Sequence, residues 1–144
     1  MKIFIENPSG TRIKKEFIEE SNAWIEKNEV AVPYPYPYGF IPGTMQEDED
    51  PLDVFLVTTS LFDRGDTPKV EVIGLVEFYE DDERDYKIIC KLPKEDVTVN
   101  ETVKKLLTHF MMHAFDNQKD KKVRVGEFYG KDIAMKEIEK CRVT

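Results

Sequence analysis

The sequence predicts a mainly β fold of the α+β class: a small β-barrel with one long and one short helix packed outside it. Short segments rich in strand-forming residues recur between turn residues, and the first clear helical periodicity begins only near Thr98. The 144 residues are 40% hydrophobic and 11% aromatic, which is enough apolar material for one core. We therefore expect a single domain over residues 1–144.

The local residue pattern predicts the strands and one proline-rich loop. Strand-forming residues predict strands near residues 2–6, 11–18, 53–58, 69–79, 85–90 and 123–128. The stretch from Ala31 to Thr44 holds four prolines, each of which fixes φ and lacks an N–H donor. This stretch is expected to be an ordered loop that displays Tyr34, Tyr36 and Tyr38, and neither a helix nor a central strand.

Two helices are expected in the last third of the chain. Thr98 and Glu101 have the spacing of a capping box at a helix start. Apolar side chains then recur along one helical stripe, at Val103, Leu106, Leu107, Phe110, Met111 and Ala114. A shorter helix is predicted from about residue 132 to residue 141.

Overall charge excludes some classes of partner. The 21 Lys and Arg residues against 29 Asp and Glu residues give a net charge of −8, which argues against nucleic acid because its binding rests on basic side chains. The N-terminus has no signal-peptide pattern and no run approaches 18 apolar residues, so we expect no membrane association and a cytoplasmic location. Cys90 and Cys141 lie far apart without metal-ligand spacing and are expected to be reduced packing residues.

A dense group of carboxylates carries the chemical signal. Asp48, Asp50 and Asp53 fall within six residues, at the start of a predicted buried strand. Ionised carboxylates within ~4 Å of one another repel by a few kcal/mol, so protons or cations must balance them. A solvated acidic loop would explain the run equally well by composition, but Asp53 begins an apolar strand, where an unpaired charge is costly. A calcium EF-hand is excluded because its sharp-turn glycine is missing.

Hard divalent cations suit such oxygen ligands. Mg²⁺ takes one or two carboxylates and leaves positions open for water and phosphate oxygens. The predicted hairpin brings further acids at Glu80, Asp81, Asp82 and Asp85. A carboxylate that is not a ligand can accept a proton from the attacking water, and Asp50, between two expected ligands, is the candidate base.

At these residues the chain resembles the soluble family I inorganic pyrophosphatases. The family signature Asp-x-Asp-Pro-x-Asp is present as Asp48 to Asp53, preceded by Tyr34-Pro-x-x-Tyr38-Gly. The opening Glu6-x-Pro-x-Gly-Thr-x-x-Lys14-x-Glu16 and the later Asp85-x-Lys87 extend the likeness over residues 3–124. Each motif is weak alone, and together they are specific.

The resemblance implies an OB-like five-stranded β-barrel that hydrolyses pyrophosphate to two phosphates with Mg²⁺. Asp50 is implied as the base, and the implied metal ligands are Asp48, Asp53, Asp85 and Glu80. The implied substrate-binding residues are Lys14, Tyr38, Lys87, Tyr34, Glu16 and Glu6.

Three departures from the family pattern concern the binding of phosphate. Glu80 stands where the family usually has Asp, so that Asp81 or Asp82 could take the metal instead. An arginine expected before Tyr34 is absent, and Lys27 is the nearest basic residue. Ala114 and Phe115 stand where the family has a Tyr-Lys pair.

Several alternatives stay open from the sequence. A related hydrolase of another phosphoanhydride, or a paralogue that binds metal and phosphate without turnover, would share most of these motifs. His109 and His113 have a helical metal-ligand spacing but lack the accompanying glutamate, and we expect them at the surface. Met112 and Phe115 could lie in a subunit contact, and a homo-oligomer is expected.

Overall fold

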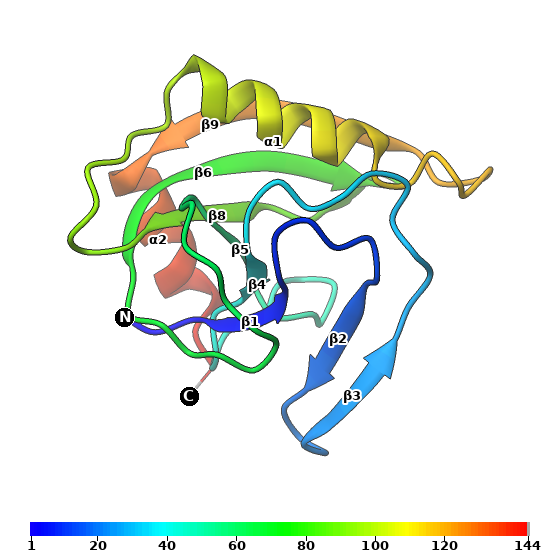
Figure 1. Cartoon of the computed structure of the whole chain (residues 1–144), viewed down its shortest axis with the longest axis horizontal. Helices are drawn as coiled ribbons and strands as arrows, with labels where there is room; N and C mark the ends of the chain where they lie inside the picture. The colour runs from blue at the N-terminus through cyan, green and yellow to red at the C-terminus, as the bar shows by residue number, and fades with distance from the viewer. Residues whose placement is uncertain (144) are drawn as a thin grey trace.

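The structure is a computed structural model that describes residues 1–143 (Figure 1). Within these residues the strands are β1 Phe4–Asn7, β2 Lys15–Ile18, β3 Ala23–Glu26, β4 Tyr38–Phe40, β5 Asp53–Leu56, β6 Glu71–Glu80, β7 Glu83–Arg84, β8 Lys87–Lys91 and β9 Val123–Gly130. The helices are α1 Glu101–His113 and α2 Lys131–Cys141. In residues 1–143 no helix has both the length and the apolar character needed to span a bilayer.

One large curved sheet organises the chain. Its hydrogen-bonded order is β1-β4-β5-β8-β6-β7, with β9 also paired to β6, and among the strands of residues 1–143 only the β5–β8 pair is parallel. The mainly β fold with one long and one short helix is confirmed. The sheet holds seven strands where five were predicted, and hydrogen bonds between its described strands do not close it into a ring.

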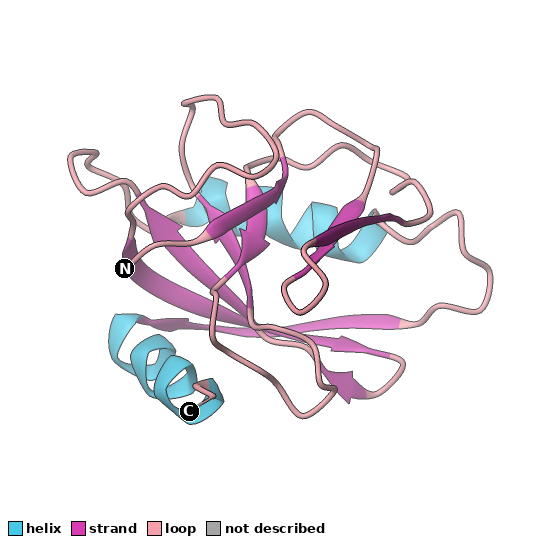
Figure 2. Cartoon of the chain, turned by 90° about the horizontal axis from the view of Figure 1, so that it is seen from below, coloured by secondary structure: helices cyan, strands magenta, loops and turns pink. Residues whose placement is uncertain are grey.

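The two helices cover opposite sides of β6 and β9 (Figure 2). Side chains alternate along the strands, so that Leu75 and Ile88 face the cluster under α2, while Val76 and Ile89 face the cluster under α1. All four side chains are at most 1% exposed. Fully burying such an aliphatic side chain contributes about 1.5–3 kcal/mol, and the shared strands tie both clusters into one structure.

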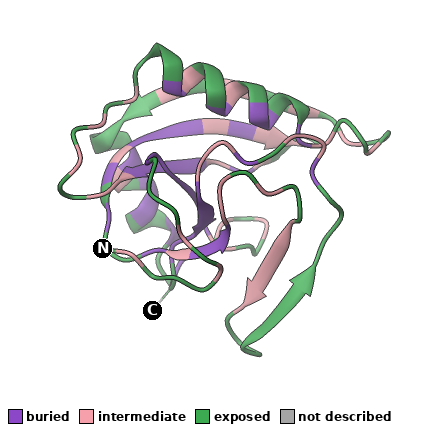
Figure 3. Ribbon diagram, in the orientation of Figure 1, coloured by how far each residue is buried: buried purple, intermediate pink, exposed green. Residues whose placement is uncertain are grey.

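The β2–β3 hairpin stands apart from the sheet, and its β3 strand is exposed along its length (Figures 1 and 3). Aromatic rings attach it to β1: Phe17 stacks on Phe4 with ring centroids 4.5 Å apart, and Trp24 lies 5.6 Å from Phe4. The sequence did not predict β3, because its partner is the neighbouring strand alone and no face of it is buried. Residues 11–14, which were predicted to be strand, precede β2 without strand structure.

A strand inside the proline-rich stretch corrects the sequence prediction. Tyr38 to Phe40 form β4, which lies between β1 and β5 rather than in a loop. The prolines at 33, 35, 37 and 42 flank this strand, so its own N–H groups stay available for pairing. Gly39 makes the central position possible, because a Cβ there would lie 1.8 Å from the carbonyl oxygen of Phe4.

The start of α1 also differs from the prediction. Asn100, not Thr98, is the N-cap, and its side-chain oxygen accepts a hydrogen bond of 2.9 Å from the Val103 N–H. Asparagine caps a helix as well as threonine does, so the choice depends on the preceding loop. The predicted apolar stripe of α1 is buried at Val103, Leu107, Phe110 and Met111, while Leu106 is 43% exposed.

Replacing Gly39 by Ala should destabilise the protein strongly. The added methyl group would meet backbone of β1, which cannot move without breaking the β1–β4 pairing. We expect a loss of about 3 kcal/mol or more in the free energy of unfolding, measured by urea denaturation. Gly130→Ser is the matched control, because a Cβ at Gly130 meets no atom within 4 Å and serine suits that helix N-cap. Equal stabilities of the two variants would contradict the close approach at Gly39.

Candidate active site

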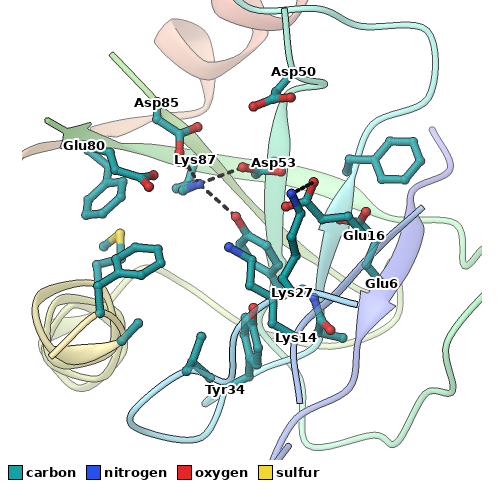
Figure 4. A pocket seen from close by; sticks show the side chains of 18 of the residues that line it. Glu6, Lys14, Glu16, Lys27, Tyr34, Asp50, Asp53, Glu80, Asp85 and Lys87 are labelled. Carbon is teal, nitrogen blue, oxygen red and sulfur yellow. Dashed lines mark hydrogen bonds and ion pairs between the residues drawn. The ribbon is translucent and has the colours of Figure 1, made fainter. Parts of the chain in front are cut away.

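A pocket of about 420 Å³ opens between the sheet, the β2–β3 hairpin and the C-terminal end of α1 (Figure 4). Six carboxylates and four lysines line it. The pocket wall includes every predicted site residue except Asp48: Glu6, Lys14, Glu16, Tyr34, Tyr38, Asp50, Asp53, Glu80, Asp85 and Lys87. The excess of carboxylates weakens the binding of an anionic ligand there, and bound cations would strengthen it.

The buried ammonium of Lys87 is the centre of the site. It donates to Asp53 Oδ2 at 2.7 Å, to Asp85 Oδ2 at 2.8 Å and to the hydroxyl of Tyr38 at 2.8 Å. These three bonds use all three protons of the ammonium group. The parallel pairing of β5 and β8 sets Asp53 directly beside Lys87.

The charged groups of this cluster shift one another's pKa values. Burial raises the pKa of Asp53 to about 6, although the ammonium of Lys87 opposes that shift. Burial also acts to raise the pKa of Asp85, but Lys87 and a hydrogen bond of 3.2 Å from Gln46 Nε2 outweigh it and hold that pKa below its usual value. Burial lowers and the two carboxylates raise the pKa of Lys87, and the carboxylates prevail, so the ammonium stays charged.

Asp48 and Asp50 lie on one turn beside this cluster. The backbone N–H of Asp50 donates to Asp48 Oδ1 at 3.0 Å, and a bond of 2.8 Å from the Gln46 N–H to the Asp50 carbonyl closes the turn. Burial, followed by the charges of Asp85 and Asp50, raises the pKa of Asp48 to about 6. Burial, then Glu16 and Asp85, raises the pKa of Asp50. Asp50 lines the pocket, whereas Asp48 is not among its wall residues.

The opposite rim of the pocket is formed by Glu6, Glu16, Lys14 and Lys27. Glu6 Oε2 accepts a bond of 2.8 Å from the Phe17 N–H, and burial with the charge of Asp53 raises the pKa of Glu6 to about 8. Lys27 Nζ lies 3.8 Å from Glu16 Oε1. Lys27, the basic residue nearest in sequence to the missing arginine, is thus one of the lysines that line the pocket.

Tyr34 and Tyr38 differ in their surroundings. Tyr38 bonds Lys87, whereas Tyr34 packs between the Tyr38 ring at 5.3 Å and the Phe110 ring at 4.6 Å. Tyr34 is only 3% exposed. Its position is that of a wall residue as much as of a ligand to substrate.

The β6–β7 turn resolves which hairpin acid faces the pocket. Glu80 lines it and is bonded by the ammonium of Lys121, while Asp81 and Asp82 are not among its wall residues. Asp81 instead accepts a bond of 2.9 Å from the Lys122 N–H. Glu80 is thus better placed than Asp81 or Asp82 to meet a metal.

The donor set suits a hard cation but does not form a closed cage. Six carboxylates line the space, and hard divalent cations prefer such oxygen ligands. In residues 1–143 no three His, Cys, Asp or Glu side chains are arranged so that they could hold an ion. Asp53 and Asp85 do converge, but on the ammonium of Lys87.

The two histidines lie away from this pocket. His109 and His113 are exposed on the outer face of α1, their rings 4.8 Å apart, and His113 Nδ1 lies 2.8 Å from Asp116 Oδ2. The predicted surface position is confirmed.

Sequence reasoning missed Gln46, Gln118 and Lys121. Gln46 bonds Asp85, and the other two line the pocket from the segment after α1. Lys121 comes into place only because Val123 pairs with Glu80 in the β6–β9 ladder. No local motif carries that long-range pairing.

Comparison with known proteins gives one family over nearly the whole chain. The family model of inorganic pyrophosphatase matches residues 3–144. An inorganic pyrophosphatase of Nanoarchaeum equitans is 35% identical over 150 residues, covering 96% of this chain and 93% of that protein. A solved pyrophosphatase of Helicobacter pylori is 27% identical with a TM-score of 0.90, covering 98% of this chain and 90% of its own. That of Thermus thermophilus is 30% identical with a TM-score of 0.88, covering 98% and 88%.

A β-barrel-like sheet with mixed carboxylates and lysines in one pocket has the make-up of a metal-dependent phosphohydrolase. The chain belongs to the inorganic pyrophosphatase family, whose members are metal-dependent hydrolases of pyrophosphate. The OB-like fold that the sequence implied is confirmed by these structures, with the sheet left open as described above.

Removing the charge of Lys87 should destabilise the metal-free protein. In Lys87→Met two buried carboxylates lose the ammonium that they share, and breaking such a buried pair costs about 3–5 kcal/mol. Urea denaturation in the presence of a chelator measures the change. Lys105→Met is the control because Lys105 is exposed on α1, and its effect should stay within about 0.5 kcal/mol. A Lys87 variant as stable as this control would refute the buried cluster.

The raised pKa of Glu6 predicts a pH dependence of stability in the metal-free protein. Its folded value of about 8 lies above the ordinary value of 4.5, so the folded protein keeps a proton that the unfolded chain releases between these limits. Its contribution is complete below pH 4.5 and is lost as the pH rises through about 8. Glu6→Gln should therefore flatten the fall of the melting temperature between these pH values. Glu20→Gln, an exposed control, should keep the wild-type slope, and equal slopes in all three proteins would contradict the shift.

Proposed function

We propose that this protein hydrolyses inorganic pyrophosphate with Mg²⁺ in the pocket around Lys87, and that Asp50 is the catalytic base. The observation that carries the proposal is the buried ammonium of Lys87, which is bonded to two carboxylates and to Tyr38 in a pocket with excess carboxylates. Family membership supports the reaction. The pocket volume of about 420 Å³ accommodates a compact phosphate compound.

In this proposal Asp48, Asp53, Asp85 and Glu80 hold the metal. Mg²⁺ bound there would lower the pKa of a coordinated water and neutralise charge on phosphate oxygens. The bond between Gln46 and Asp85 and the bond between the Asp50 N–H and Asp48 fix two of these carboxylates in place. Such preset orientations reduce the cost of assembling the site.

Other residues of the chain transfer the proton and bind the phosphate groups. Asp50 accepts a proton from the water whose oxygen attacks phosphorus, and the bridging P–O bond breaks so that the bridging oxygen leaves with the second phosphate. Lys14 donates to phosphate oxygens, Lys87 stabilises their negative charge electrostatically while it keeps its three bonds, and Tyr38 donates to one of them. Glu6 and Glu16 close the rim, and Tyr34 supports the ring of Tyr38.

Some properties expected from the sequence stay predictions. The homo-oligomer is one: Leu106 and Met112, 43% and 40% exposed on the outer face of α1, offer apolar surface for a second copy. Phe115, in contrast, lines the pocket. The single domain, the lack of nucleic-acid binding and the cytoplasmic location are further predictions.

Phosphate release from pyrophosphate should require Mg²⁺ and should collapse in Asp50→Asn. Loss of a general base lowers turnover by about 10² to 10⁴-fold, while the exposed carboxamide leaves folding unchanged. Steady-state assays with added Mg²⁺, and with a chelator, measure both effects. Glu47→Gln removes a neighbouring exposed charge outside the pocket and should keep wild-type turnover.

Two outcomes would defeat this assignment. Normal turnover by Asp50→Asn would remove Asp50 from its role as base. Rates on tripolyphosphate or nucleotides that equal those on pyrophosphate would favour a phosphoanhydride hydrolase of wider specificity, which the missing arginine would explain.

A further inference from the structure

We propose that Lys121 is a phosphate-binding residue of this chain, which exchanges its bond to Glu80 for one to a phosphate oxygen of the substrate. The proposal rests on the function proposed above and adds a residue that the sequence motifs do not contain. Its basis is the place of one ammonium group in the pocket wall.

The end of α1 leaves this wall without charge. Ala114 and Phe115 line the pocket there. Beside them stands Lys121, which comes from the segment between α1 and β9 and reaches the same wall. One cation therefore occupies the part of the pocket where the helix itself supplies none.

The backbone around Lys121 is fixed. Glu80 pairs with Val123 at the end of the β6–β9 ladder. The Asp81 N–H donates to the Lys122 carbonyl at 2.8 Å, and the Lys122 N–H donates to Asp81 Oδ1 at 2.9 Å. The Lys121 side chain therefore leaves a rigid ladder end, which sets its direction into the pocket.

An aromatic ring brings Lys121 together with a second cation. The ammonium of Lys121 lies 5.1 Å from the centroid of the Phe115 ring, and that of Lys14 lies 5.2 Å from the same centroid. Both distances are within the range of cation–π attraction. Phe115 thus helps to hold two lysines, Lys14 and Lys121, at one end of the pocket.

The bond to Glu80 is one that an anion can replace. The side chains of Lys121 and Glu80 are 24% and 25% exposed, so water screens their attraction. Asp81 Oδ2 lies farther off, at 3.9 Å. A phosphate oxygen that enters the pocket can compete with one carboxylate for this ammonium. A purely structural role, in which Lys121 only ties its loop to β6, is the alternative that experiment must separate.

The first test measures binding of inorganic phosphate to the metal-free protein by calorimetry. Lys121→Met should weaken phosphate binding about tenfold or more, because a charge-assisted hydrogen bond is lost. Lys121→Arg keeps the charge and should stay within about threefold of wild type. Lys119→Met and Lys122→Met remove exposed lysines that do not line the pocket, and should leave the dissociation constant unchanged.

A second variant keeps the test informative if Lys121→Met does not fold. In metal-free Glu80→Gln the competing carboxylate is gone, so phosphate should bind more tightly than to wild type. Asp82→Asn removes an equal charge outside the pocket and is the control for general electrostatics. Tighter binding in Glu80→Gln alone supports the exchange, and equal changes in both variants overturn it.

Turnover then separates this inference from the proposed function. With Mg²⁺ and pyrophosphate, Lys121→Met should raise KM more than it lowers kcat, and Lys121→Arg should restore KM. Wild-type phosphate affinity and KM in Lys121→Met would overturn the inference and leave the hydrolase assignment intact. A wild-type protein that releases no phosphate would overturn that assignment, and the metal-free phosphate affinities would still judge Lys121 by themselves.

Discussion

The ammonium of Lys87 is the group on which the rest of the site depends. Asp53 and Asp85 are both largely buried, and two ionised carboxylates in one buried space repel unless a cation lies between them. Lys87 supplies that cation and bonds Tyr38 with its remaining proton. The sheet topology makes the arrangement possible, since parallel pairing of β5 with β8 sets Asp53 at the level of Lys87. Lys87 therefore has a place in the β5–β8 pairing and also balances the charge of the two carboxylates.

Around this centre, further hydrogen bonds orient the acids of the site. Gln46 bonds Asp85 with its side chain and closes the turn of Asp48 and Asp50 with its backbone. A single residue thus links the turn that carries the expected base to the segment between β7 and β8 that carries Asp85, an expected metal ligand. Burial, together with neighbouring carboxylates, raises the pKa values of Asp48 and Glu6. A bound divalent cation favours the charged form of such carboxylates and would offset both effects.

How far the sequence predicted this structure depends on the range of each interaction. The acidic signature from Asp48 to Asp53 is local, so spacing alone identified it, and ten of the eleven residues named for the site line one pocket. Strand β4 was missed because prolines on both sides hid three residues that have free N–H groups. Strand β3 was missed because it buries no face, and Lys121 because its place depends on a strand pairing across 43 residues. Periodicity and motifs report local order, whereas these features are set by long-range contacts.

The departures from the family pattern all concern the binding of phosphate. The pocket contains Lys27 and, close to Phe115, Lys121, and each of these lysines lies beside a carboxylate of the pocket. Lysine offers a point charge without arginine's bidentate fork, so it binds phosphate with less control of orientation. A carboxylate neighbour reduces the net attraction further, because the anion must displace it. In the proposed function, binding strength would therefore depend on several exchangeable lysine contacts, and the fixed element of the pocket is the bonded group of Lys87, Asp53, Asp85 and Tyr38.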